Sequence, residues 1–255
     1  MRQRRASITA GVGIVAVALL GLASPANAIA NGDPVKPGRY AFSVKLTMTG
    51  IPTADGGKRN SACSGALVSS QWIITAGHCF RDANGVRVER PVADSTVATI
   101  GRTDLTDTTK GHDLEIVEVR QSPTADVSLA KLAEPVRDIR PIKVSGTAPE
   151  VGTVLRLTGY GSTTSSNPAP VTWLRTGQLE VVGLTATVTQ VKGHAPQADT
   201  TPCPYDSGGP FFVERGRKGP ALVAVVSNGP SCPHSSIESA ARVDNIADWV
   251  AEVTH

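Results

Sequence analysis

The sequence predicts an all-β protein with one short helix at its C-terminal end. Most apolar segments are brief and either alternate with polar residues or form short apolar runs, as strands do. Glycine and proline, 25 and 18 of the 255 residues, separate these segments at frequent intervals. A helical pattern is clear only near the end, where Ile246, Trp249, Val250 and Val253 share one face. Many short strands with few helices favour β-barrels.

The first 28 residues have the pattern of a secretory signal peptide. A basic start that includes Arg4 and Arg5 precedes an apolar stretch, and Ala26-Asn27-Ala28 is a small-x-small cleavage site. The apolar stretch is short and interrupted by glycines, which argues against a membrane anchor. The adjacent arginines leave both the general and the twin-arginine export routes open. We therefore expect a secreted protein that has no membrane attachment once the signal is cleaved.

Removal of this segment changes the charge of the chain. The segment contains three arginines and no acidic residue, so the number of basic residues falls from 25 to 22, equal to the 22 acidic residues. A neutral chain lacks the basic excess that is typical of nucleic-acid binding, and we expect no nucleic-acid partner. The remaining residues, 29–255, are enough for one β domain.

The strands can be placed from their patterns. In the first half we expect strands at 40–49, at two places between 63 and 74 around a turn at 69–71, at 96–100, at 114–119 and from 127 on. In the second half we expect them at 154–158, 174–182, 185–191 and 221–226. A polar, glycine-rich loop is expected at 51–60, and the proline-containing stretch 133–152 reads as the crossing between two halves.

Three polar residues stand in contexts that suit nucleophilic catalysis. Ser207 lies in Asp206-Ser207-Gly208-Gly209-Pro210, where glycines let main-chain N–H groups come close to the hydroxyl, although the same residues are common turn formers. His78 follows an apolar run, and an imidazole titrates in the range that a serine needs from its base. Asp126 begins another apolar run, where a carboxylate needs a partner. The order His, Asp, Ser indicates a catalytic triad.

With these residues, the chain resembles the chymotrypsin-like serine endopeptidases of the trypsin fold, in a form similar to secreted actinobacterial members. The resemblance covers nearly everything after Ala28. It is carried by the segments Cys63-Ser64-Gly65, Thr75-Ala76-Gly77-His78-Cys79, Gly159-Tyr160-Gly161, Asp206-Ser207 and Ser227-Asn228-Gly229, together with Asp126. It implies two six-stranded antiparallel β-barrels, at about 29–140 and 150–243, with the active site in the cleft between them and a helix at about 244–253.

The resemblance also implies residue roles. Ser207 would be the nucleophile, His78 its base and Asp126 the acid that orients the base, while the amides of Tyr205 and Ser207 would form the oxyanion hole. Polypeptides would be the substrates and protein inhibitors further partners. We expect a monomer that needs no cofactor.

Cleavage after Ala28 would make Ile29 the first residue of the mature chain. In the family, a new N-terminal Ile or Val inserts into the protein, and its ammonium pairs with the Asp before the nucleophile, here Asp206. Signal peptidase would then create the activating terminus itself. The alternative is an ordinary, exposed N-terminus.

Four cysteines in an exported chain predict disulfides rather than a metal site. By the resemblance, Cys63 pairs with Cys79 behind the histidine, and Cys203 with Cys232 across the specificity pocket. No CxxC motif occurs and the histidines are scattered, so we expect no zinc site. The acidic residues of the polar loop at 104–113 match no EF-hand and read as solvated loop charges.

The expected specificity pocket departs from the family pattern. Thr201 occupies the floor position, where trypsins have Asp, so a preference for Arg or Lys does not carry over. On the opposite wall, Glu238 or Ser239 stands where many members have glycine. A Glu238 there would point inward and select a basic side chain, close the pocket, or face solvent. The other residues expected around the pocket are Pro202, Ser227 and Gly229.

A second departure concerns the oxyanion hole. Tyr205 stands where the family usually has glycine, in a place that can require a backbone conformation favourable only for glycine. Its ring would crowd the leaving-group side. The alternative function is therefore a catalytically weak or inactive binding protein on the same fold, against which the intact triad argues. A lipase-like esterase predicts the order Ser, Asp, His and a Gly-x-Ser-x-Gly elbow, and neither is present.

Overall fold

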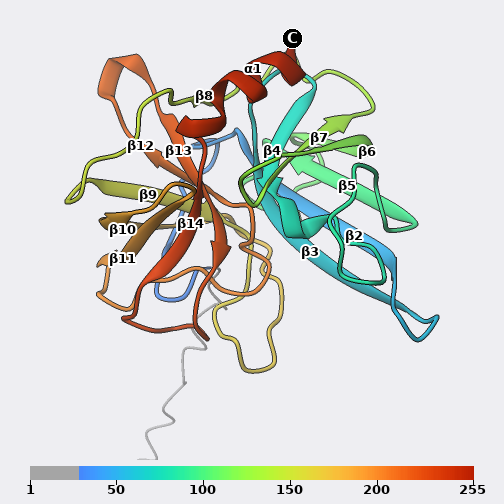
Figure 1. Cartoon of the computed structure of the whole chain (residues 1–255), viewed down its shortest axis with the longest axis horizontal. Coiled ribbons are helices and arrows are strands. Elements are labelled where there is room, and N and C mark those ends of the chain that lie inside the picture. The colour runs from blue at the N-terminus through green and yellow to red at the C-terminus, as the bar shows by residue number, and fades with distance from the viewer. Residues whose placement is uncertain (1–28) are drawn as a thin grey trace, which may run out of the picture.

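A computed structural model describes residues 29–255, so the expected signal segment lies outside the described residues. Two β-barrels stand side by side, and the helix α1 (Ala247–Thr254) lies across one end of the molecule between them (Figure 1). The predicted fold class, two six-stranded antiparallel barrels with a C-terminal helix, is confirmed.

The first barrel closes in the order β2-β3-β4-β7-β6-β5. Its strands are β2 (Ser43–Pro52), β3 (Lys58–Leu67), β4 (Trp72–Ala76), β5 (Ser95–Ile100), β6 (His112–Gln121) and β7 (Val127–Leu132). The alternation that predicted β2 places Val44, Leu46 and Met48 in the core, because successive side chains of a strand point to opposite faces.

The predicted loop at 51–60 is wrong in extent. β2 continues to Pro52 and β3 begins at Lys58, so only 53–57 form the tip of the hairpin. A register shift between Met48 and Ile51 bends the strand at Gly50, whose φ of 75° suits glycine. The bend returns Ile51 to the core, where it is buried.

The second barrel follows the order β9-β10-β11-β14-β13-β12 and closes by the pairing of β12 with β9. Its strands are β9 (Val154–Gly159), β10 (Arg175–Leu184), β11 (Val188–Ala195), β12 (Pro210–Val213), β13 (Ala221–Asn228) and β14 (Glu238–Arg242). Two short strands extend it: β1 (Asp33–Pro34) pairs with β10, and β8 (Lys143–Val144) pairs with β13. The sequence did not predict β12, which is short, or β14, which lacks β-branched and aromatic residues.

The two barrels share apolar packing at the seam between them. Phe42 of the first half packs edge-on against Phe212 of β12, with ring centroids 5.3 Å apart. The helix covers the same core with the predicted stripe: Ile246 and Val250 are buried, and Trp249 and Val253 pack against them in part. A shared core of this kind fixes the relative position of the loops that face the cleft.

Candidate active site

His78 and Asp126 are brought together by the pairing of two neighbouring strands. His78 lies in the 3₁₀ turn Gly77–Cys79 that follows β4, and Asp126 immediately precedes β7. Because Ala76 pairs with Val127 across these strands, the two side chains leave the barrel at the same edge. The His78 Nδ1 lies 2.8 Å from Asp126 Oδ2, and the His78 main-chain N–H donates to Asp126 Oδ1 at 2.9 Å.

The Asp126 carboxylate is held ionised by its neighbours. Burial alone would raise its pKa, but hydrogen bonds from His78 and from the Ser227 hydroxyl, the latter at 2.7 Å, bring the pKa to about 2. Arg87 adds a positive charge 3.8 Å from Oδ1 and donates to the Ala125 carbonyl. The sequence placed Ser227 in the substrate pocket and gave no role to Arg87.

The loop that carries Ser207 leaves two of its amides free. Main-chain donors on either side are used within the fold: Asp206 N–H bonds to Cys203 O, and Gly208 N–H to Val226 O. The amides of Tyr205 and Ser207 find no acceptor among residues 29–255. Two unpaired N–H groups beside a serine are what an oxyanion hole requires.

His78 and Ser207 line the same two cavities. The first, which we call the Glu238 cavity, has a volume of about 310 Å³ and is closed by Pro202, Ser227 and Glu238. The second, the Tyr205 cavity, has a volume of about 300 Å³ and lies against Tyr205 and the Cys63–Cys79 disulfide. Neither the His78 Nε2 nor the Ser207 hydroxyl is hydrogen-bonded to a described residue, so both can meet a ligand.

The structure joins the cysteines in two pairs, Cys63 with Cys79 and Cys203 with Cys232. The first pair ties β3 to the turn that bears His78. The second ties the loop before Ser207 to the segment after β13, and both of its cysteines are buried. Each disulfide therefore holds one wall of the space in which His78 and Ser207 lie.

Comparison with known proteins agrees with this geometry. A family model described as trypsin matches residues 29–250. The chain belongs to the trypsin family. It is 25% identical over 213 residues to a beta-fibrinogenase-like protein of Daboia siamensis, covering 75% of this chain and 77% of the relative. It is also 25% identical over 214 residues to trypsin 5G1 of Aedes aegypti, covering 75% of each. The protein is a serine-type endopeptidase.

Asp206, the residue before Ser207, occupies a site that is built around its carboxyl group. Asp206 is fully buried, and a Cβ on Gly159 or Gly161 would collide with its carboxyl group, so these two glycines make room for it. Its oxygens accept the amides of Gly161 at 2.8 Å and Cys203 at 3.0 Å. Burial raises the pKa of Asp206 to about 7 in spite of these bonds.

Ile29 reaches the same carboxyl group. Its side chain is fully buried in the core of the second barrel, and its main-chain N–H lies near enough to help lower the pKa of Asp206. The bridge between Ala30 and Thr201 fixes this segment beside the loop of Ser207. The structure thus brings together the two residues that the sequence assigned to an activation pair.

The Glu238 cavity differs in part from the expected specificity pocket. Pro202, Ser227, Gly229 and Glu238 line it, but Thr201 does not. Thr201 is fully buried, and its backbone is held in the bridge to Ala30, so its role as the floor stays a prediction.

Glu238 lies at the start of β14 and points into the cavity. Its side chain is 4% exposed, and it packs so closely on Gly229 that a Cβ there would collide with the carboxyl group. His234 Nε2 lies 2.7 Å from Glu238 Oε1. Burial, with a contribution from the nearby Asp206 charge, raises the pKa of Glu238 to about 8, while burial lowers the pKa of His234. The sequence did not identify His234, because its place beside Glu238 depends on the turn between β13 and β14.

Tyr205 adopts a left-handed backbone conformation, with a φ of 75°. Such a φ is uncommon for a residue other than glycine and costs about 1–2 kcal/mol. The amide of Tyr205 nevertheless stays free, as described above. The left-handed backbone of Tyr205 therefore leaves this N–H group available to a ligand.

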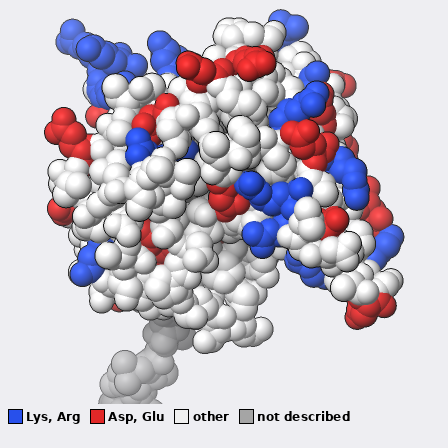
Figure 2. Space-filling view, viewed as in Figure 1, with Lys and Arg blue, Asp and Glu red and all other residues white. Residues whose placement is uncertain are grey.

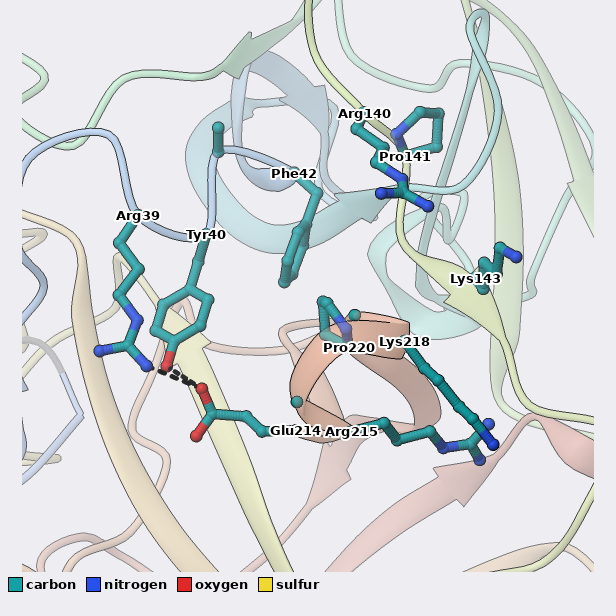
Figure 3. A pocket seen from close by; sticks show the side chains of 13 residues that line it. Arg39, Tyr40, Phe42, Arg140, Pro141, Lys143, Glu214, Arg215, Lys218 and Pro220 are labelled. Carbon is teal, nitrogen blue, oxygen red and sulfur yellow. Dashed lines mark hydrogen bonds and ion pairs between the residues drawn. The ribbon is translucent and has the colours of Figure 1, made fainter.

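Another cavity, with a volume of about 510 Å³, lies apart from the site and shares no lining residue with the two cavities of His78 and Ser207. Arg39 and Tyr40 both bond to Glu214 at its edge (Figure 3). Glu214 also pairs with Arg156, so it joins the segment before β2 to the second barrel. Lysine and arginine side chains project from the loop between β12 and β13 near this cavity (Figure 2).

The described part of the chain contains no cluster of three or more His, Cys, Asp or Glu residues able to hold a metal ion. The acidic loop residues are used in pairs instead, as Asp113 with Arg102 at 2.9 Å and Asp107 with Lys110 at 3.3 Å. Within residues 29–255, no helix is long and apolar enough to cross a membrane.

Proposed function

We propose that the protein is an exported serine endopeptidase that cleaves peptide bonds through an acyl-enzyme on Ser207. The observation that carries the proposal is the pair of free amides at Tyr205 and Ser207, two residues that line the Tyr205 cavity together with His78. A binding protein on this fold has no use for two unsatisfied N–H groups beside a serine, and the strained φ of Tyr205 keeps one of them available.

The chemistry follows from these positions. Ser207 Oγ attacks the carbonyl carbon of the scissile bond, and His78 Nε2 takes the hydroxyl proton. The amides of Tyr205 and Ser207 hold the negative oxygen of the tetrahedral intermediate. His78 then gives the proton to the leaving amine, and water releases the acyl group by the same steps. Asp126 keeps the proton of His78 on Nδ1, so that Nε2 is free to accept.

A small fluorophosphonate distinguishes the enzyme from the inactive alternative. Such a probe forms a covalent bond only with an activated serine, and it is small enough to enter past the Tyr205 ring. We expect stoichiometric labelling of the peptide that contains Ser207, measured by mass spectrometry. A protein that stays unlabelled while correctly folded would favour the binding-protein alternative.

We propose that Glu238 gives the enzyme a preference for a basic side chain next to the scissile bond. Its carboxyl group is the acidic group that lines the cavity of Ser207, and an entering Arg or Lys would pair with it. Because the pKa of Glu238 is about 8, its negative charge grows as the pH rises through this value. A substrate lysine remains charged there, since its own pKa is about 10.4.

The ratio of kcat/KM for a Lys substrate over its norleucine analogue is therefore expected to increase between pH 7 and pH 9. A charged hydrogen bond of this kind is equivalent to about 10- to 100-fold in that ratio. Glu238→Gln should lower the ratio and remove its pH dependence. Glu252→Gln, a change of an exposed residue on α1, is the matched control. A ratio that is flat with pH in the native enzyme would exclude Glu238 as the selecting group.

We propose that the mature chain begins at Ile29 and that its ammonium pairs with Asp206. The burial of Ile29 supports this, because its main-chain nitrogen lies near enough to Asp206 to help lower the pKa of that carboxyl group, and cleavage would make this nitrogen a charged donor. A second arrangement, a frayed terminus, does not fit a fully buried Ile29.

N-terminal sequencing of the secreted protein should give Ile29 first. Adding Gly-Ser before Ile29 should lower kcat/KM by about 10- to 100-fold, the usual range for one hydrogen bond to a charged group. An extended protein with full activity would contradict the pairing.

A further inference from the structure

Lys45 of β2 is a buried lysine that the proposed mechanism does not use. It is 4% exposed, although lysine is almost never buried without a partner. Burial lowers its pKa to about 8, and the negative charge of Asp206 opposes that shift. A sequence reading cannot detect it, because Lys45 occupies a position on the polar face of an alternating strand.

One peptide group connects Lys45 with Asp206. The Lys45 ammonium donates to the Tyr160 carbonyl oxygen at 3.1 Å, and the Gly161 amide of the same peptide donates to Asp206 Oδ1 at 2.8 Å. Hydrogen bonds in series polarise one another, so the ammonium strengthens the bond that the carboxylate receives. Within the described residues the two charges do not approach to ion-pair distance, and the peptide lies between them.

The Tyr205 ring also lies near the ammonium. Lys45 Nζ lies 5.6 Å from the ring centroid, within the range of a cation–π contact. The Ser64 hydroxyl, which accepts the Tyr160 amide, donates to the carbonyl of Tyr205. The residue that replaces glycine in the oxyanion loop is thus fastened through both its ring and its carbonyl to the surroundings of Lys45.

We infer that Lys45 is a second, built-in positive charge for Asp206, which holds the loop of Tyr205 and Ser207 in its active form together with the N-terminus of Ile29. Lys45 is a positioning residue, since it acts on the loop and not on the substrate. The inference rests on the proposed function of this site. If the Ile29 ammonium were the only cation for Asp206, the active form of the loop would depend fully on a free N-terminus. With Lys45 as a second cation, it depends on the N-terminus only in part.

A double-mutant cycle tests this role. Four proteins are compared: native and Lys45→Met, each with a free Ile29 and with Gly-Ser before it. When one cation is lost, the other still neutralises Asp206. When both are lost, Asp206 has no cation and is either charged without a partner or protonated, and both states are more costly for the loop than either single loss. The Gly-Ser extension lowers kcat/KM by some factor in each background. We expect this factor to be at least about 10 times larger in Lys45→Met than in the native protein.

Two readouts separate positioning from a merely structural effect. If Lys45→Met only lost packing, it would lower kcat/KM by the same factor with either N-terminus. The inference would therefore be overturned if Gly-Ser before Ile29 lowered kcat/KM by the same factor in Lys45→Met as in the native protein. An extended native protein whose activity is entirely lost would also overturn it. Lys45→Gln, which keeps a donor for Tyr160 but no charge, should behave as Lys45→Met, and Lys143→Met, an exposed lysine of β8, should behave as native.

Hydrogen exchange of residues 203–209 gives a measurement that does not require catalysis. We expect fast exchange of this loop only in the doubly changed protein. If the native protein with a free Ile29 failed to cleave peptides but showed this exchange pattern, the proposed function would fail and the role of Lys45 would stand. Equal exchange in all four proteins would overturn the role of Lys45.

Discussion

Ser207→Ala is expected to lower kcat on the order of 10⁶-fold, a magnitude that belongs to the Ser-His-Asp template in general. Without the hydroxyl, no acyl-enzyme forms, and His78 has no proton to accept. A residual acceleration on the order of 10³-fold over the uncatalysed reaction should persist, because the amides of Tyr205 and Ser207 still bind the oxyanion. Cleavage of a mixed peptide library by the secreted protein measures the loss, and the fluorophosphonate label should disappear with it.

The control for this variant is Ser70→Ala. Ser70 is an exposed serine in the turn between β3 and β4, and it belongs to neither cavity of His78. It should cleave and label as the native protein does. Cleavage retained by Ser207→Ala would show that the activity comes from another residue or another protein.

The sequence predicted those parts of the site that depend on local patterns. His78, Asp126 and Ser207 each lie next to a recognisable strand or glycine turn, and their order along the chain identifies the family. The left-handed φ of Tyr205 could likewise be anticipated, because glycine was the expected residue there. For the fold, alternation was sufficient for β2, but it could not locate β12, which has only four residues. It also could not locate β14, because pairing with neighbouring strands replaces the intrinsic strand preference that the residues of β14 lack.

The parts that the sequence missed depend on contacts between distant segments. Arg87, from a loop of the first barrel, and the Ser227 hydroxyl, from strand β13 of the second, meet at Asp126. Lys45 reaches Asp206 only through the Tyr160–Gly161 peptide. The position of Thr201 was counted back from Ser207, and such a count cannot show that Thr201 is fully buried in a bridge to Ala30. Among the residues expected around the pocket, Glu238 lines the cavity of Ser207 and Thr201 does not.

These long-range contacts share one feature, which is that each fixes a group next to the Ser207 loop. Asp126 is held by three donors from His78 and Ser227, and Asp206 accepts the amides of Gly161 and Cys203. Fixed donors act on a charged intermediate without reorganisation, which is why such sites are effective. The strained Tyr205 is tolerated in this setting because its surroundings hold it from several sides.

Asp126→Asn is expected to lower kcat about 10⁴-fold, again a magnitude taken from the Ser-His-Asp template. In the native protein, Asp126 Oδ2 accepts both His78 Nδ1–H and the Ser227 hydroxyl, while Oδ1 accepts the His78 main-chain N–H. All three partners are donors. An asparagine must present its NH₂ to one side, where it faces a donor.

The least costly way to remove that clash is for His78 to shift its proton from Nδ1 to Nε2. The Nδ1 atom then accepts from the side-chain amide of the introduced asparagine, and Nε2 can no longer take the proton of Ser207. We therefore expect kcat to fall while KM changes little, since neither cavity loses a lining residue. Measurement of kcat against pH and of the rate of fluorophosphonate labelling should show the same loss.

Asp248→Asn, a change of an exposed carboxylate on α1, is the matched control for Asp126→Asn. If Asp126→Asn kept kcat within about 10-fold of native, Asp126 would not be the residue that sets the tautomer of His78.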